Sequence, residues 1–179
     1  MTLKRWEKIS SENKFKNPWW TYRIDKFRLP NGKEGKYHYL HSGHSVFVVP
    51  ILENEKFLLV KQFRYLFDRE SVEFPAGGMQ DDDSPRDVAR KELIEETGFD
   101  GELTKINEFG PFVGLSDEMS YVFLATDLRR CYDYKKDDTE EFEYLERTAE
   151  EIDQMIVSGE IFDGMAISTW VYAKIHLKI

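Results

Sequence analysis

The chain has 179 residues, a length that suits one domain or one domain with a small appendage. Apolar residues make up 41% of the chain, which is enough for a folded core, and the 33% of charged residues indicate a well-solvated surface rather than wholesale disorder. A net charge of −9 disfavours a long nucleic acid as the partner, although divalent cations can bridge an acidic chain to a phosphorylated small molecule.

Cysteine content and hydropathy indicate the cellular compartment. The single cysteine, Cys131, excludes a disulfide within the chain and a cysteine-based zinc site. No apolar run reaches transmembrane length, and residues 1–16 are too polar for a secretory signal. We therefore expect a protein of the reducing cytoplasm that does not engage a membrane.

The N-terminal part of the chain predicts a small antiparallel sheet. Residues 1–18 are typical of an irregular or partly helical lead. Residues 20–29 alternate crudely and are rich in strand formers, and the turn signature Pro-Asn-Gly-Lys at 30–33 separates them from a second strand near 37–40.

Strands also dominate the middle of the chain. The nearly continuous apolar run at 45–52 predicts a strand that is buried on both faces. A second strand follows at 56–64, and a short one at 71–75 ends at a proline. Further strands are expected near 103–109 and 120–125.

Three helices follow from periodicity and end signals. The clearest spans 85–97, with Ser84 as the N-cap, a proline at the first helical position, and Gly98 placed for a left-handed cap. A second helix opens at Thr148 and ends at a glycine, and a last one spans 165–177. Strands mixed with a few helices predict an α/β or α+β sandwich.

An acidic cluster lies on the helix at 85–97. Glu92, Glu95 and Glu96 fall at i, i+3 and i+4 and therefore share one face. Their repulsion destabilises the helix by roughly a few tenths of a kcal/mol per pair, which a bound cation offsets. Carboxylate oxygens suit Mg²⁺ or Mn²⁺. Three glutamates alone are more often a solvated helix face, so their surroundings decide between the two interpretations.

Those surroundings favour a site. Ala89, Leu93 and the methyl group of Thr97 form a neighbouring stripe that we expect to face the core. Residues 75–78, Pro-Ala-Gly-Gly, give a tight backbone in which a carbonyl can approach a metal without hindrance from side chains.

Residues 77–99 resemble the Nudix box, G-x5-E-x7-R-E-U-x-E-E-x-G-U, in which U is a bulky apolar residue. Its fixed positions are occupied here by Gly77, Asp83, Lys91, Glu92, Leu93, Glu95, Glu96, Gly98 and Phe99. Every spacing holds, and the two departures, Asp83 for glutamate and Lys91 for arginine, keep the charge. In the family the arginine orients acidic side chains, and we expect Asp87 or Glu95 to hold Lys91 as a point charge.

Segments outside the box are similar to the ADP-ribose pyrophosphatase branch of the Nudix family. They are residues 28–33, 62–64, 73–77, 114–118 and 140–142. The resemblance implies a Nudix α/β/α sandwich with a mixed sheet, plus a small N-terminal antiparallel sheet. It implies that residues 1–43 are a dimerisation segment, that 44–179 are the hydrolase domain, and that homodimers form with swapped N-terminal sheets.

The resemblance also implies a reaction and a metal. The reaction is hydrolysis of the pyrophosphate bond of a nucleoside diphosphate sugar, with ADP-ribose giving AMP and ribose 5-phosphate. Two to three Mg²⁺ or Mn²⁺ ions are implied, held by Glu92, Glu96 and the carbonyl of Ala76, with Glu95 as a third or bridging acid.

The catalytic base implied by this branch is a loop acid beyond the box. The matching stretch is acidic, and Glu140 is the first choice within it and Asp138 the second. A solvated acidic loop is an equal alternative.

Further residues are implied at the substrate. Arg64 and Glu73 are expected to bind it, Trp19 to stack on its base from a partner subunit, and residues 116–118 to shape its sugar or phosphate end. The alternatives are a surface charge at Arg64 and a core or dimer contact at Trp19.

The sequence also allows other functions. One is a GDP-mannose or other sugar-nucleotide pyrophosphatase, because the outer segments are shared, and another is a house-cleaning or cap-type nucleotide hydrolase. A different class is a catalytically weak nucleotide-sugar-binding module, which only Asp83 and Lys91 favour.

Overall fold

The computed structural model describes residues 3–80, 82–131 and 143–179, and the chain divides into two units. The first contains Met1–Gly43 and Gly110–Met119, and the second contains His44–Phe109 and Ser120–Ile179. Within the described ranges, no helix combines the length and the apolar character needed to cross a membrane.

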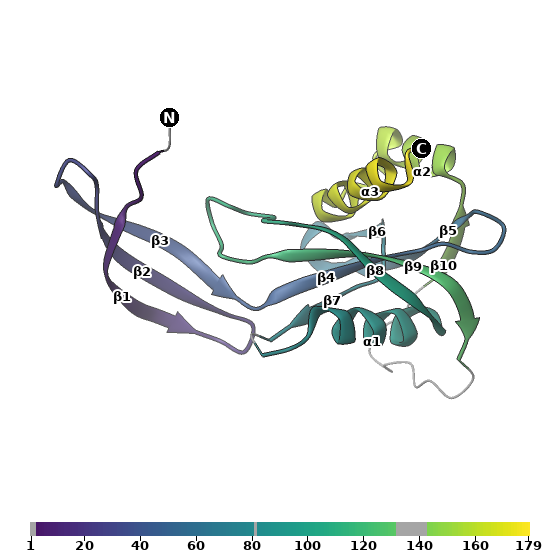
Figure 1. The fold of residues 1–179 in the computed structure, drawn as a ribbon, viewed down its shortest axis with the longest axis horizontal. Helices are drawn as coiled ribbons and strands as arrows, with labels where there is room; N and C mark the ends of the chain where they lie inside the picture. Colours follow the sequence, from purple (N-terminus) through teal and green to yellow (C-terminus); the bar gives the residue numbers. More distant parts are fainter. Residues whose placement is uncertain (1–2, 81, 132–142) are drawn as a thin grey trace. The chain divides into compact units, whose positions relative to one another are not determined.

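The first unit is built on an antiparallel sheet of three strands in the order β1-β2-β3 (Figure 1). The strands are β1 (Glu7–Lys16), β2 (Trp20–Arg28) and β3 (Glu34–Ser42). The expected turn joins β2 to β3, and Gly32 adopts φ +85° there while its N–H donates to the Leu29 carbonyl at 2.9 Å. The predicted N-terminal antiparallel sheet is confirmed.

The irregular or partly helical lead expected for residues 1–18 is wrong, because most of it forms β1. Every residue of this strand is exposed, so the strand carries no apolar alternation that a sequence pattern could reveal. Its pairing with β2 also shifts register twice, between Lys8 and Ser10 and between Asn13 and Phe15. The backbone ladder to β2, rather than a buried face, holds the strand.

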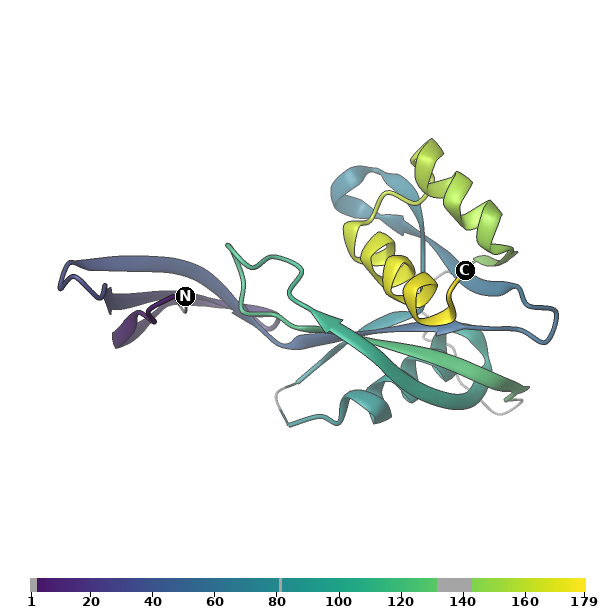
Figure 2. The same cartoon turned by 45° about the horizontal axis from the view of Figure 1, so that its top comes forward.

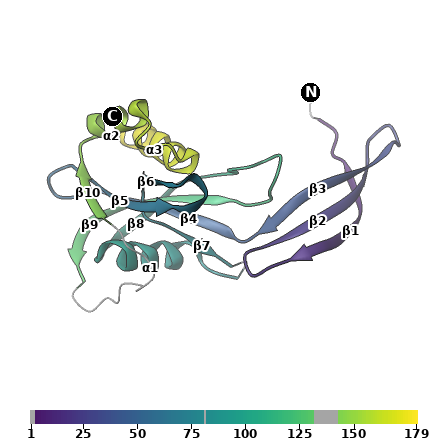
Figure 3. The same ribbon diagram turned by 180° about the vertical axis from the view of Figure 1, so that it is seen from behind.

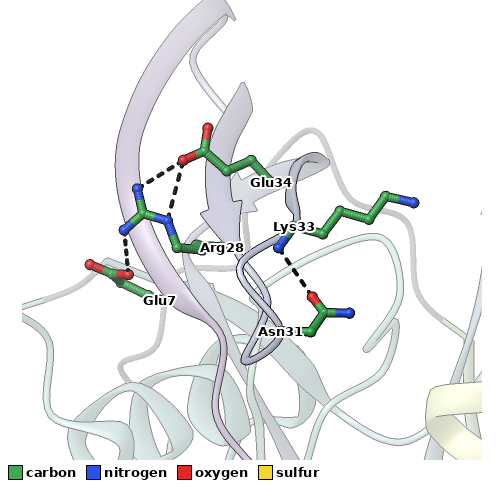
Figure 4. Close-up of polar contacts among 5 residues, drawn as sticks. All are labelled: Glu7, Arg28, Asn31, Lys33 and Glu34. Carbon is green, nitrogen blue, oxygen red and sulfur yellow. Dashed lines mark hydrogen bonds and ion pairs between the residues drawn. The ribbon is translucent and has the colours of Figure 1, made fainter.

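One arginine links all three strands at the end of the sheet where β2 turns into β3 (Figure 4). Arg28 on β2 donates from Nη1 to Glu7 on β1 at 2.9 Å and from Nη2 to Glu34 on β3 at 2.8 Å. Beside it, the Asn31 side chain closes the turn by accepting from the Lys33 N–H at 3.1 Å. Exposed ion pairs stabilise little, so we assign Arg28 the role of aligning three strands that already pair through their backbones.

The segment Gly110–Met119 lies against β3. Leu40 forms a parallel bridge with this segment and donates its N–H to the Leu115 carbonyl at 2.8 Å. The His41 ring contacts the Asp117 carboxylate, with 2.8 Å between Nδ1 and Oδ2. The chain thus returns to the N-terminal sheet after leaving it at residue 44.

The second unit contains two sheets. The four-stranded sheet has the order β7-β4-β9-β8, and β4 and β9 run parallel while the other pairs are antiparallel. Its strands are β4 (His44–Pro50), β7 (Ala76–Met79), β8 (Phe99–Phe109) and β9 (Ser120–Arg130). The three-stranded sheet has the order β10-β5-β6. Its strands are β5 (Phe57–Arg64), β6 (Arg69–Glu73) and β10 (Glu143–Arg147), and the 3₁₀ turn η1 (Tyr65–Phe67) joins β5 to β6.

Helices cover both sides of these sheets, as Figures 1 and 2 show. The helix α1 (Pro85–Thr97) lies on one side, and α2 (Ala149–Ser158) and α3 (Gly164–Leu177) lie on the other. The strand β4 explains the arrangement, because its side chains pack on both faces of the sheet. Val46 and Val48 belong to the hydrophobic cluster that contains the buried residues of α1, and Val49 belongs to the cluster that contains those of α3. The predicted α/β/α sandwich with a mixed sheet is confirmed.

The helix ends confirm most of the expected signals. α1 begins at a proline and ends at Gly98, whose φ of +71° is left-handed. At the start of α2, Thr148 and Glu151 form a complete capping box. The side chain of Ser84 forms no capping bond, however, and instead Asp83 closes the preceding turn by accepting from the Gln80 N–H at 2.7 Å.

The packing of Trp170 on α3 generates a stability prediction. Its ring lies 4.8 Å from Phe57 and 6.0 Å from Phe74, and its indole N–H donates to Asp153 at 2.8 Å. We expect Trp170→Ala to lower the free energy of unfolding by about 3–5 kcal/mol, because a large buried side chain is lost and a cavity remains. Urea denaturation of the variant against wild type measures this.

The matched control is the next residue, Val171, which is exposed on the same helix. Val171→Ala should change the free energy of unfolding by no more than about 0.5 kcal/mol. Equal losses in the two variants would show that α3 does not depend on its buried face.

Candidate active site

Two glutamates of α1 meet the backbone of β7. Figure 3 shows the helix running beside this strand, and the two elements are in contact. Glu96 is only 6% exposed, and its Oε2 accepts from the Ala76 N–H at 3.0 Å. A Cβ added to Gly77 would lie 2.2 Å from Cδ of Glu92, so the Glu92 carboxyl occupies the space that a side chain at 77 would need.

This contact follows from how α1 is anchored. Ala89, Leu93 and Thr97 are buried as predicted and fix the helix against the sheet. The neighbouring face then directs Glu92 and Glu96 to the β7 backbone, because residues three to four apart lie on one side of a helix.

The third glutamate of the cluster is arranged differently. Glu95 is more exposed, and its Oε2 lies 3.0 Å from the Lys91 ammonium, which also lies 3.4 Å from Glu92. The hydrogen bond to Glu95 raises the pKa of Lys91 more than its partial burial lowers it, so Lys91 stays charged at neutral pH. The expected partner Glu95 is confirmed for Lys91, within a face that carries three carboxylates and one ammonium.

The donor set fits a hard divalent cation. Within residues 3–80, 82–131 and 143–179, no three acidic, histidine or cysteine side chains already converge on one point. Glu92 and Glu96 do converge on a backbone whose glycine leaves room for a close approach. Two carboxylates and a backbone carbonyl are few ligands, which suits Mg²⁺ because it keeps several waters and binds substrate phosphates.

An ion pair between a buried carboxylate and a partly exposed arginine lies on the sheet formed by β5 and β6. Arg64 donates from Nε to Oε1 of Glu73 at 2.7 Å and from Nη2 to Oε2, and Gln62 reaches the same carboxylate at 3.4 Å. The bond to Glu73 raises the pKa of Arg64, against the effect of partial burial, and the nearby charges of Asp163 and Glu96 raise it further. Arg64 therefore lies within electrostatic reach of the α1 site.

Other residues expected at the site belong to the first unit or lie outside the described residues. Glu140 and Asp138 belong to the segment 132–142 and lie outside the described residues. Trp19 belongs to the first unit, where its side chain is exposed. The residue is 78% exposed, and its backbone N–H donates to the Asn17 side chain at 2.9 Å. In the same unit, Asp117 pairs with His41.

Sequence reasoning missed the pairing of Arg64 with Glu73. A signal for it was present, because Glu73 is flanked by Val72 and Phe74 in a short strand that must be buried. A carboxylate buried among apolar neighbours needs a cationic or hydrogen-bonding partner.

Comparisons with known proteins identify the family of this chain. The NUDIX domain family model matches residues 41–158, and the nucleoside diphosphate sugar hydrolase N-terminal domain model matches residues 6–40. The chain therefore belongs to the Nudix family, and the predicted enzyme class, a Nudix hydrolase, is confirmed.

Relatives extend the likeness over most of the chain. It is 36% identical over 143 residues to an ADP-ribose pyrophosphatase of Bacillus subtilis (strain 168), covering 79% of this chain and 77% of that protein. It is also 36% identical over 132 residues to a GDP-mannose pyrophosphatase of Enterobacter sp. (strain 638), covering 69% of each chain. A solved structure described as an ADP compounds hydrolase matches with a TM-score of 0.86 at 17% identity, over 99% of this chain and 97% of that one, and it supports the fold.

The glycines before α1 generate a paired prediction. In Gly77→Ala the new methyl group must displace Glu92, whose carboxyl is the flexible end of its side chain, so the fold should survive while metal binding suffers. Gly78→Ala meets nothing within 4 Å and serves as the control. We expect the dissociation constant for Mn²⁺, measured by electron paramagnetic resonance, to rise about tenfold or more in Gly77→Ala only.

Wild-type Mn²⁺ affinity in a folded Gly77→Ala protein would show that Glu92 need not occupy this position to hold a metal.

Proposed function

We propose that this chain hydrolyses the pyrophosphate bond of a nucleoside diphosphate sugar in a Mg²⁺-dependent reaction, and that ADP-ribose is cleaved to AMP and ribose 5-phosphate. The observation that carries the proposal is the convergence of Glu92 and Glu96 on the backbone of Ala76 and Gly77 in a Nudix chain. The likeness to a named ADP-ribose pyrophosphatase supports the choice of substrate.

Each residue has a proposed role. Glu92, Glu96 and the carbonyl of Ala76 would hold two to three Mg²⁺ or Mn²⁺ ions, with Glu95 as a third or bridging acid. A bound divalent ion supplies charge neutralisation of the diphosphate and lowers the pKa of a bound water. Lys91 holds Glu95 and lies near Glu92, and this keeps part of the acidic face ordered.

The remaining roles concern the base and the substrate. We assign removal of a proton from the attacking water to Glu140, with Asp138 as the second choice. Arg64, within electrostatic reach of Glu96, binds a phosphate of the substrate, for which its planar donors are suited.

GDP-mannose or another sugar nucleotide is the second candidate substrate. The named GDP-mannose pyrophosphatase among the relatives favours it, at the same identity as the ADP-ribose enzyme. The contacts that Lys91 makes with two of the three glutamates favour an active enzyme over a weak nucleotide-sugar-binding module.

The N-terminal sheet is proposed to be a dimerisation segment. Residues 1–43 would exchange between two copies, with 44–179 as the hydrolase domain, and Trp19 would stack on the substrate's base from the partner copy. Support comes from the exposed aromatic side chains of this N-terminal segment, including Trp6, Phe15 and Trp19. The cytoplasmic location expected from the sequence stays a prediction.

A panel of nucleoside diphosphate sugars tests the proposed activity. With Mg²⁺ and added phosphatase, phosphate release should be fastest from ADP-ribose, and chelation of the metal should abolish it. Glu96→Gln should lower the rate by at least about 10²-fold, because a metal ligand loses its charge while the amide keeps its shape.

The control is Glu53→Gln, which makes the same change in an exposed turn and should keep the wild-type rate. Faster release from GDP-mannose would favour the second candidate substrate. Wild-type turnover in Glu96→Gln would refute the assignment of Glu96 as a metal ligand.

A substitution at Trp19 tests the proposed dimer. Light scattering should give wild type twice the 21.2 kDa of one chain. Trp19→Ser should weaken this dimer and raise KM for ADP-ribose more than it lowers kcat, because both the apolar contact and the stacking surface are lost. Val157→Ser on α2 removes an equally exposed apolar side chain from the second unit and should change neither. A monomeric wild type would contradict the proposed exchange.

A further inference from the structure

Glu73 is the most deeply buried carboxylate among the described residues, at 1% exposure. Taking an ionised carboxylate out of water costs several kcal/mol unless it is paired and hydrogen-bonded. Arg64 supplies two hydrogen bonds to this carboxylate and Gln62 a third, weaker one, so the arrangement holds a charge where an isolated one would not be stable.

The register of the sheet explains how the pair forms. On β5 and β6, Glu73 lies opposite Val60 and Ser71 lies opposite Gln62. Gln62 and Arg64 follow Val60 at steps of two residues, so their side chains share the face that carries Glu73. Both partners are therefore held on a rigid ladder rather than on a loop.

The pair leaves half of the guanidinium group available. Arginine has five N–H donors in a planar fork, and the bonds to Glu73 use the Nε donor and one donor of Nη2. The edge formed by Nη1 and the second Nη2 donor donates no hydrogen bond to any other described residue, and the side chain is 45% exposed. A free edge of this kind matches two oxygens of a phosphate group.

A fixed cation of this kind is more useful for binding than a mobile one. An arginine that is free to rotate loses rotamer entropy when it binds a phosphate, and that loss weakens affinity. The bidentate contact with Glu73 removes this freedom before the substrate arrives.

We infer that Glu73 is a positioning residue that fixes the fork of Arg64, so that the free edge of Arg64 binds a phosphate of the substrate while Glu73 itself touches no substrate atom. The inference rests on the proposed function, and it differs from the sequence expectation, in which Glu73 binds the substrate directly. Direct binding would require a carboxylate that is both exposed and free of Arg64.

A double-mutant cycle tests the inference. Binding of α,β-methylene ADP-ribose, a non-hydrolysable diphosphate, is measured by calorimetry with Mg²⁺ for wild type, Glu73→Gln, Arg64→Lys and the double variant. We expect Glu73→Gln to raise the dissociation constant about tenfold, because the fork loses its anchor. Arg64→Lys should do the same, since one ammonium cannot form both planar contacts, and the double variant should be no weaker than Arg64→Lys.

Ser71→Ala is the matched control. Ser71 is buried on the same face, and its hydroxyl has no hydrogen-bond partner, so its removal perturbs packing beside the pair without breaking a bond. It should leave the dissociation constant unchanged. In turnover, Glu73→Gln should raise KM more than it lowers kcat, a split that a general loss of folding would not produce.

Several outcomes would overturn the inference. They are additive losses in the double variant, wild-type binding by Glu73→Gln or by Arg64→Lys, and no binding of the analogue by wild type. Where Glu73→Gln does not fold, Glu73→Asp takes its place in the cycle, because it keeps the charge but shortens the reach to the Arg64 fork. Absence of wild-type turnover on every sugar, with the binding cycle intact, would end the hydrolase proposal and leave this one standing.

Discussion

The contact between α1 and the backbone of β7 is the constraint on which the rest of the site depends. The Ala76 N–H fixes one oxygen of Glu96, and the missing side chain of Gly77 makes room for Glu92. Both carboxylates are thereby held against a backbone that can contribute its own oxygen. A helix with the same glutamates but no such strand beside it would present only a solvated acidic surface.

Two-sided burial makes this contact possible. Val46 and Val48 on β4 pack toward α1, while Val49 packs toward α3, so the strand is clamped between two cores. β7 pairs with β4 and is fixed by it. The burial of Ala89 and Leu93 beneath the acidic face therefore anchors the helix, and the bond from the Ala76 N–H to Glu96 then fixes the position of that carboxylate.

The sequence predicted what local chemistry determines. The ends of α1 follow from a proline and from Gly98, and the start of α2 follows from the capping box of Thr148, because these signals act within a single turn of helix. The strand β1 was missed because it buries nothing and shifts register twice. The pairing of Arg64 with Glu73 was missed because it depends on strand register, which composition does not encode.

The two departures from the family's box are explained by the structure. The carboxylate of Asp83 accepts from the Gln80 N–H and closes the turn before α1, a short-range bond for which aspartate is long enough. Lys91 pairs with Glu95 and lies near Glu92, which leaves the three carboxylates of this face with a net charge of −2. Arg64 does not change that balance, because Glu73 already neutralises it. A diphosphate adds further negative charge, so divalent cations are needed to bridge it to this face.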